Sequence, residues 1–177
     1  MLKIVLLVIV VAIVAMLGFA ATRPDSFVVK RTAVIDAPPE KLVGMVQDFH
    51  QWGAWSPWEK MDPGMSRTYE GPPAGVGSAY AWSGNDKVGA GRMEIQKVVP
   101  AREVVFKLDF LKPFKASNTG RFAFEPEGAA TKVIWTMEGK NPYISKVMGL
   151  FFNMDKMIGK DFETGLANMK AAAEKQA

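Results

Sequence analysis

The last stretch of the chain constrains its fold more than any other part. Between about Ser145 and Lys175, apolar residues recur at steps of three and four. This spacing predicts one long amphipathic helix, because residues three and four apart share a helix face. Charged residues, Lys146 among them, are expected on the opposite, solvent-facing side. The apolar stripe consists of Val147, Leu150, Phe151, Met154, Met157, Ile158, Phe162, Leu166 and Met169. Such a helix is poorly stable alone, so the rest of the chain must supply a wide apolar surface.

Alternating patterns in the middle of the chain predict that surface. Period-two alternation of apolar and polar residues is typical of strands with one buried and one wet face. Strands are predicted at residues 27–35, 66–70, 77–83, 89–99, 102–110, 118–125 and 131–138. A short helix opens at Pro39, and no helical pattern follows between Met65 and Lys140, which disfavours a parallel βαβ architecture. We therefore predict an α+β domain in which a curved antiparallel sheet of about seven strands surrounds the C-terminal helix.

The N-terminal segment has a different character. Residues 4–21 form an uncharged, mostly aliphatic run after Lys3. As a helix this run spans roughly 27 Å, close to the roughly 30 Å hydrocarbon core of a bilayer. We expect residues 1–23 to form an uncleaved, single-pass membrane anchor and residues 24–177 to form the domain. The alternative is a secretory signal, because Gly18-Phe19-Ala20 offers small residues at the cleavage spacing. The flanking charges oppose one another, and the large following domain favours an extracytoplasmic placement.

Composition excludes several classes of function. The formal net charge of +4 is scattered without a basic cluster, so a nucleic-acid partner is not expected. The absence of cysteine excludes disulfides, thiolate zinc sites and a cysteine nucleophile. The only histidine, His50, is a general-base candidate beside Asp48 and Glu59, although a surface histidine is the simpler interpretation. Asp48, Glu59 and Asp62 offer a weak alternative as a hard-cation site, and we expect neither a metal nor a cofactor.

A cluster of tryptophans is the most unusual local feature. Trp52, Trp55 and Trp58 lie within seven residues, and Pro57 forces the chain to leave any helix there. Two interpretations remain open. The cluster either plugs one end of the core or forms an aromatic rim at the mouth of a pocket, and one set of residues can do both.

Several separated segments carry a resemblance to a known family. They read IDAPPEK at 35–41, VQDF at 46–49, WGAWSPW at 52–58, GVG at 75–77, YAWSGN at 80–85, GAGRMEI at 89–95 and DFETGL at 161–166. With the order of predicted elements, they resemble the START-like superfamily (SRPBCC), and within it the polyketide cyclase/dehydrase-like proteins. The resemblance covers essentially everything after the anchor. It implies a helix-grip fold with a deep apolar cavity beneath the C-terminal helix, but no shared catalytic set that maps onto this chain.

Large apolar side chains on the sheet and helix are the candidate ligand-binding residues. They are Trp55, Trp58, Tyr80, Trp82, Met93, Phe106, Leu108, Phe110, Phe122, Phe124, Trp135, Met137, Met148 and Met154. A pocket of this composition suits a hydrophobic ligand, with Tyr80, Trp82 and Trp135 as hydrogen-bond donors. The leading hypothesis is a membrane-tethered domain that binds a lipid-like, aromatic or polyketide-like small molecule. The alternatives are a cyclase- or dehydratase-type enzyme with a catalytic polar group such as Tyr80, and a protein-interaction module that uses the tryptophan cluster and strand edges.

Overall fold

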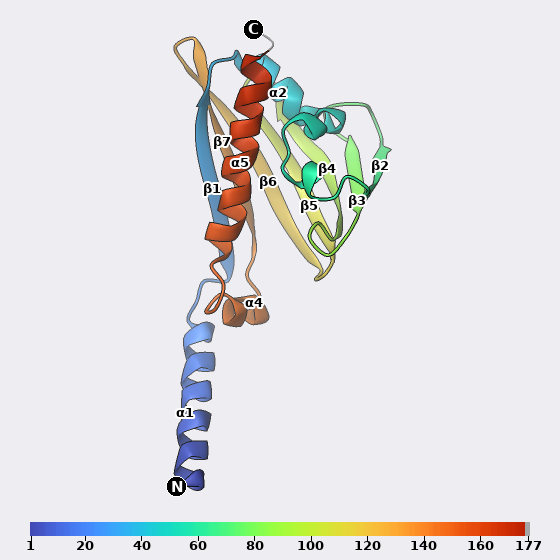
Figure 1. The fold of residues 1–177 in the computed structure, drawn as a ribbon. Coiled ribbons are helices and arrows are strands. Elements are labelled where there is room, and N and C mark those ends of the chain that lie inside the picture. Colours follow the sequence, from blue (N-terminus) through green and yellow to red (C-terminus); the bar gives the residue numbers. More distant parts are fainter. Residues whose placement is uncertain (176–177) are drawn as a thin grey trace.

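The computed structural model describes residues 1–175, and a single antiparallel sheet dominates it. Seven strands lie in the order β1-β7-β6-β5-β4-β3-β2 (Figure 1). The strands are β1 Ser26–Ile35, β2 Ser66–Glu70, β3 Ala79–Ser83, β4 Ala90–Val99, β5 Glu103–Lys112, β6 Ala116–Glu127 and β7 Ala130–Lys140. The helices are α1 Leu2–Ala21, α2 Pro39–Gln47, η1 Phe49–Ala54, α3 Trp58–Met61, α4 Tyr143–Met148 and α5 Met154–Glu174. The α+β fold and all seven predicted strands are confirmed, with strand ends that differ by at most two residues.

The predicted long C-terminal helix is two helices, α4 and α5. The Asn153 side chain accepts a hydrogen bond from the Lys156 backbone N–H at 2.9 Å, which caps a new helix start. The apolar stripe is therefore confirmed only in its second half, where Phe162, Leu166 and Met169 are buried. In the first half, the prediction that Met148 and Met154 face the sheet is wrong, because the break turns them outward and leaves them 44% and 42% exposed.

Lys146 also departs from its predicted place on the wet face. It is 8% exposed, and its ammonium group donates a hydrogen bond to Asp25 in the linker after α1 at 2.5 Å. This bond from the Lys146 ammonium lowers the pKa of Asp25. The contact connects α4 to the segment through which α1 joins the domain.

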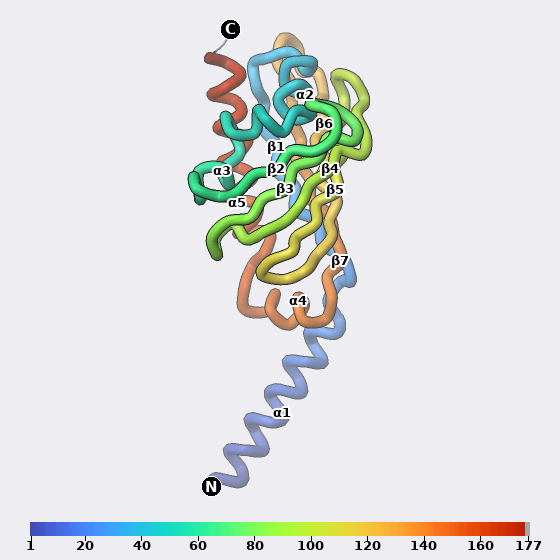
Figure 2. The backbone as a smooth tube through the Cα atoms, turned by 90° about the vertical axis from the view of Figure 1, so that its right-hand side faces the viewer, coloured from blue at the N-terminus to red at the C-terminus, as the bar shows by residue number. Residues whose placement is uncertain are grey.

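Helices cover the inner face of the sheet unequally. The α5 helix packs mainly on β1, while α2 contacts β5 and β6 (Figure 2). α2 and the C-terminal end of α5 lie at one end of the domain, here called the top (Figure 1). α1, α4 and the start of α5 lie at or beyond the opposite end, called the base (Figure 1). The sheet is therefore capped at the top by α2 and η1 together with α5, rather than by the C-terminal helix alone.

The first helix projects away from the base as a separate rod (Figures 1 and 2). It is strongly apolar along its length, and of its side chains only that of Ala20 is buried. By length and composition α1 is able to cross a membrane, a test that secretory signals near an N-terminus also pass. It contacts α4, where the Tyr143 hydroxyl donates a hydrogen bond to the Leu17 carbonyl at 2.9 Å.

Candidate functional site

The tryptophan cluster closes the top of the core. Trp52 and Trp55 are 3% and 0% exposed, and their indole N–H groups donate to the carbonyls of Val46 and Met45 at 2.9 and 3.1 Å. Both polar atoms are thus satisfied inside the domain. This confirms the plug interpretation for these two residues. It contradicts the use of Trp55 as a protein-docking contact, because no partner can reach a side chain without exposed surface.

Aromatic rings fill the space between α5 and the upper half of the sheet. Trp135 of β7 stacks on Phe162 of α5 with ring centroids 3.9 Å apart, and on Phe122 of β6 at 4.6 Å. Trp58 is half-buried and meets Trp135 and Phe162 edge-on. Eight of the predicted ligand-binding residues are buried: Trp55, Tyr80, Met93, Phe106, Phe122, Phe124, Trp135 and Met137. Most of the predicted set is therefore core.

The predicted deep cavity beneath the C-terminal helix is not among the two hollows that stand out on residues 1–175. One is a shallow trough of about 470 Å³ on the outer face of the sheet, lined by residues such as Lys107, Thr119 and Glu138. The other, of about 260 Å³, lies at the base between the linker after α1 and the α4–α5 turn. The physical reason is the stacking described above, since large rings occupy the space that the resemblance assigns to a ligand.

The lower half of the inner sheet face is less completely covered. Along β5, the inward side chains of Val104 and Phe106 are 0% and 2% exposed, whereas Leu108 and Phe110 are half-buried. On β3, Tyr80 is 3% exposed and Trp82 is half-buried. Burial thus decreases toward the base on both strands. Trp82, Leu108 and Phe110 are the predicted site residues that form an apolar surface with partial access, and we call these three the lower inner face.

Asn118 is a polar side chain within this apolar region. The strand register places it in one row with Leu108 of β5 and Gly139 of β7. Asn118 is 8% exposed, and its amide N–H donates to the Met137 sulfur at 4.0 Å, a weak acceptor. Gly139 leaves room for this amide, because a Cβ there would lie 2.0 Å from Asn118 Oδ1. The amide therefore retains hydrogen-bonding capacity toward the inner face.

Sequence reasoning missed Asn118, although a signal was present. Residues two apart on a strand share a face, so Asn118 lies on the same side as Phe122 and Phe124. A polar residue at an inward position of an otherwise apolar strand marks a candidate ligand contact.

Two of the three predicted hydrogen-bond donors, Tyr80 and Trp82, are already engaged within the domain. The Tyr80 hydroxyl donates to Glu59 at 2.5 Å, and Arg67 binds the same carboxylate at 2.7 Å. Burial is the main cause that raises the pKa of Tyr80, and the hydrogen bond to Glu59 raises it further. The Trp82 indole N–H donates to the Val88 carbonyl at 2.9 Å. The polar group named in the cyclase or dehydratase alternative is thus committed to an internal contact.

His50 and the nearby carboxylates do not converge on one point. His50 is exposed, stacks on Tyr69 with ring centroids 4.1 Å apart, and contacts Asp48 at 3.0 Å. Burial opposes ionisation of Asp48, but hydrogen bonds from Gln51 and His50 outweigh it and lower the pKa of Asp48. Asp62 accepts hydrogen bonds from the backbone N–H groups of Gly64 and Asn85. Each carboxylate therefore has its own structural partner.

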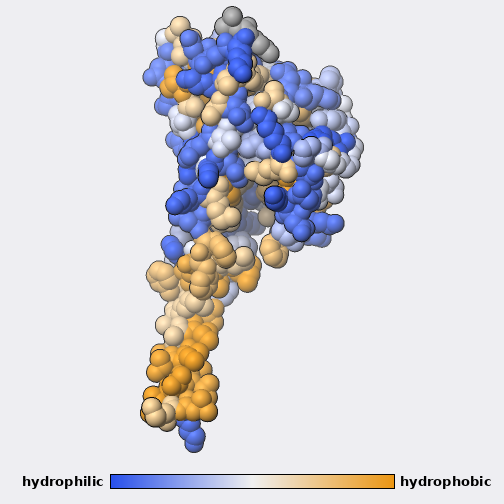
Figure 3. Space-filling view, in the orientation of Figure 1, coloured by the Kyte–Doolittle hydropathy of each residue, from blue (hydrophilic) through white to orange (hydrophobic). Residues whose placement is uncertain are grey.

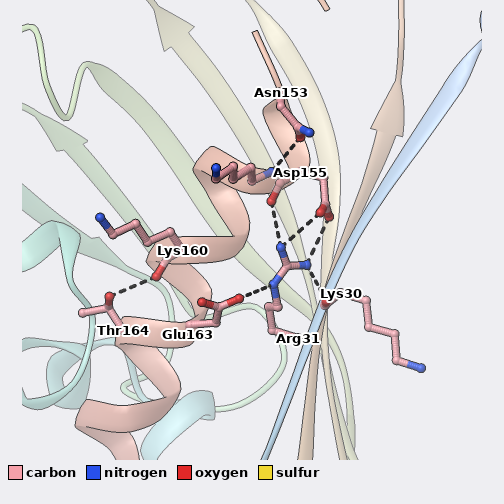
Figure 4. Close-up of polar contacts among 8 residues, drawn as sticks. Lys30, Arg31, Asn153, Asp155, Lys160, Glu163 and Thr164 are labelled. Atoms are coloured by element: carbon pink, nitrogen blue, oxygen red, sulfur yellow. Dashed lines mark hydrogen bonds and ion pairs between the residues drawn. The ribbon is translucent and has the colours of Figure 1, made fainter.

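Arg31, on the inner face of β1, connects this strand to the first half of α5. Its guanidinium binds the Asp155 carboxylate at 3.1 Å and the Glu163 carboxylate at 2.7 Å (Figure 4). It also donates to the Asp155 backbone carbonyl at 3.0 Å. The hydrogen bond from Arg31 lowers the pKa of Asp155. Gly159 makes room for this contact, because a Cβ there would lie 1.8 Å from the Arg31 guanidinium. The result is a fixed position for the base-proximal end of α5.

Asp161 of α5 gives a pH-dependent prediction. Burial raises its pKa, an effect that nearby Lys160 partly offsets. The native state therefore binds the proton of the Asp161 carboxyl group more tightly than the unfolded chain does. The free energy of unfolding consequently decreases as the pH rises through the range in which Asp161 ionises. Asp161→Asn is expected to raise the melting temperature at pH 7 relative to the parent chain and to lose that advantage at pH 3. Thermal denaturation at the two pH values tests this, and an equal difference at both would contradict it.

Comparison with known proteins agrees with this architecture. The sequence profile of the family described as polyketide cyclase / dehydrase and lipid transport matches residues 26–174. Curated protein sequences provide no significant match. Three solved structures illustrate the shared fold. Protein CV1439 from Chromobacterium violaceum superposes with a TM-score of 0.61 at 15% sequence identity. The superposition covers 86% of this chain and 99% of the CV1439 chain.

The second and third structures also match over most of both chains. Ginseng major latex-like protein 151 from Panax ginseng has a TM-score of 0.60 at 14% identity, with coverage of 85% and 99%. The Aha1 dimer from Colwellia psychrerythraea has a TM-score of 0.55 at 18% identity, with coverage of 84% and 96%. At these identities the likeness shows the START-like fold alone. The family profile spans nearly the whole domain, and the chain belongs to the polyketide cyclase / dehydrase and lipid transport family.

Proposed function

We propose that α1 anchors the protein in a membrane and that the domain binds a hydrophobic small molecule at the lower inner face. The observation that carries this proposal is the change in burial along β5, from 0% exposed at Val104 to half-buried at Leu108 and Phe110. A domain built only for stability gains by sealing such apolar surface. Membership of a family described by lipid transport supports the same conclusion.

The chemistry of the lower inner face indicates the kind of ligand. Trp82, Leu108 and Phe110 offer aromatic and aliphatic contacts, which suit an acyl chain or a fused-ring system. Asn118 lies beside Leu108 in the register and offers both a donor and an acceptor. We infer an elongated or flat apolar ligand with one hydrogen-bonding group, such as a carboxyl or carbonyl.

A binding measurement tests this proposal. The full chain, delipidated and placed in nanodiscs, is titrated with a fluorescent fatty acid and with a polycyclic ketone, and empty nanodiscs serve as the blank. We expect saturable binding above the blank. Asn118→Leu is expected to weaken it about fivefold to tenfold, since one hydrogen bond contributes about 1 kcal/mol. Thr119→Leu, the adjacent position on the outer face, is the matched control and should leave binding unchanged. Binding that is equal to the blank for both probes would exclude the proposal.

The anchor has an independent test. We expect the protein extracted from membranes to have the intact mass of a chain that retains α1, with the domain extracytoplasmic. Mass spectrometry and protease accessibility in intact cells measure the two properties separately. A mature protein that lacks the residues before about Thr22 would show instead that the segment is a cleaved signal.

A further inference from the structure

Large apolar side chains are exposed at the base of the domain. They come from the β5–β6 hairpin, α4, the α4–α5 turn and the first turn of α5. We call them the base patch: Leu111, Phe114, Ile144, Met148, Phe151, Phe152, Met154 and Met157, each between 42% and 71% exposed. In Figure 3 the hydrophobic surface of α1 continues onto this end of the domain. Such a concentration is unusual for a surface in contact with water.

The contact between α1 and α4 sets the depth of the base patch. A 20-residue helix is about 30 Å long, which equals the thickness of the hydrocarbon core. If α1 spans the bilayer, its last turn therefore lies at the membrane boundary. Tyr143 of α4 bonds to Leu17 in that region of α1 at 2.9 Å, so α4 lies at the same boundary. Tyrosine is enriched at this depth because its ring is apolar and its hydroxyl is polar.

We propose that the base patch inserts into the interface of the same bilayer that α1 spans. This inference rests on the proposed membrane anchor. The β5–β6 hairpin fits the role, because exposed Phe114 is flanked by exposed Lys112 and Lys115, which are able to contact lipid phosphates. The hairpin and α4 lie at the same end of the domain in both views (Figures 1 and 2). The α1–α4 contact holds only one part of the domain at the membrane, whereas insertion of the base patch also holds the β5–β6 hairpin there.

Insertion has a consequence for the lower inner face. Leu108 and Phe110 lie on the same strand as Leu111 of the base patch, one to three residues earlier. With the patch inserted, this part of β5 lies directly above the lipid. A hydrophobic ligand can then pass between the bilayer and the domain without crossing water.

Spin labels on the full chain in nanodiscs test the insertion, because the chain has no cysteine of its own. Single labels are placed at Phe114→Cys and Phe151→Cys in the base patch, at Val8→Cys in α1, and at Ala129→Cys in the exposed β6–β7 turn at the top. The measurement is the accessibility of each nitroxide to oxygen, which partitions into lipid, and to a water-soluble nickel complex. We expect labels 114 and 151 to report lipid, at a shallower depth than label 8 in the middle part of α1, and to differ from the water-exposed label 129.

The other outcomes separate the two proposals. If label 8 reports lipid while 114 and 151 report water, the insertion is wrong and the anchor stands. If label 8 reports water as well, the anchor itself fails. Labels 114 and 151 shielded from both reagents would indicate a protein contact, with a second copy or another chain, and would also overturn the insertion.

A charged variant provides a second measurement. Phe114→Glu with Phe151→Glu is expected to move a label at Leu111→Cys, on the hairpin away from the α1–α4 contact, from lipid to water, because carboxylates resist transfer into the interface. Both phenylalanines are exposed, so the melting temperature should stay near that of the parent chain. Val28→Glu on the outer face is the matched control, and an unchanged label signal in the double variant would contradict the insertion.

Discussion

Replacing Trp135 with alanine is expected to lower the free energy of unfolding by about 3–5 kcal/mol. Trp135 is 2% exposed, and its ring stacks between Phe122 of β6 and Phe162 of α5. Gly165 lets α5 approach it closely, because a Cβ there would lie 2.8 Å from the indole. The cavity left by the substitution lies where α5 contacts the sheet, so little of it can be closed by relaxation.

Chemical denaturation of the full chain in mild detergent measures this loss. Trp58→Ala is the matched control, since Trp58 belongs to the same aromatic cluster, where it meets Trp135 and Phe162 edge-on, but is only half-buried. We expect Trp58→Ala to cost clearly less. Equal losses for the two variants would mean that the upper core is not the filled, tightly packed region described here.

The same Gly-to-Ala change is expected to have opposite effects at two positions. At Gly120 of β6 a new Cβ would lie 2.2 Å from the Phe106 ring inside the core, so Gly120→Ala should destabilise the domain by about 1–3 kcal/mol. At Gly44 of α2 a Cβ would meet nothing within 4 Å. Gly44→Ala should therefore stabilise the domain by about 0.5–1 kcal/mol through helix propensity. Denaturation midpoints give both signs, and a stabilising Gly120→Ala would contradict the close approach of the Phe106 ring of β5 to the Gly120 backbone of β6.

The sheet was predictable because strand patterns repeat every two residues over long stretches. Val133, Trp135 and Met137 recur at every second position, and all three are buried as expected. The second half of the C-terminal helix was predictable for the same reason, since Phe162 and Leu166 follow helical spacing and face the core. In these segments, burial in the core is the only role of the apolar residues, so pattern and structure agree.

The break between α4 and α5 was not predictable from periodicity. Apolar residues continue at helical spacing through Met148, Phe151 and Met154, although the chain turns there. A hydrophobicity pattern indicates only that a surface avoids water. Burial in the core is one reason for such a surface, and the membrane contact proposed for the base patch is another. The exposure of Met148 and Met154 is thus where the interpretation of the sequence failed.

The extent of the cavity was also beyond sequence reasoning. Large residues on an inner face are needed both to line a pocket and to fill one, and composition does not separate these roles. Only the distances between side chains in the structure distinguish a lined pocket from a filled one. The ring centroids of Trp135 and Phe162, for example, are 3.9 Å apart, which leaves no space for a ligand between them. The predicted site residues consequently divide among a filled upper core, the lower inner face and, for Met148 and Met154, the base patch.

Photo-crosslinking to the membrane-embedded protein tests the central claim most directly. The full chain in nanodiscs is loaded with a diazirine-bearing fatty acid and irradiated, and the modified peptides are identified by mass spectrometry. We predict adducts at Trp82, Leu108 or Phe110, reduced by an excess of unlabelled fatty acid, and no adducts at Phe122 or Phe124. Adducts confined to α1 and the base patch, or insensitive to the competitor, would contradict ligand binding at the lower inner face.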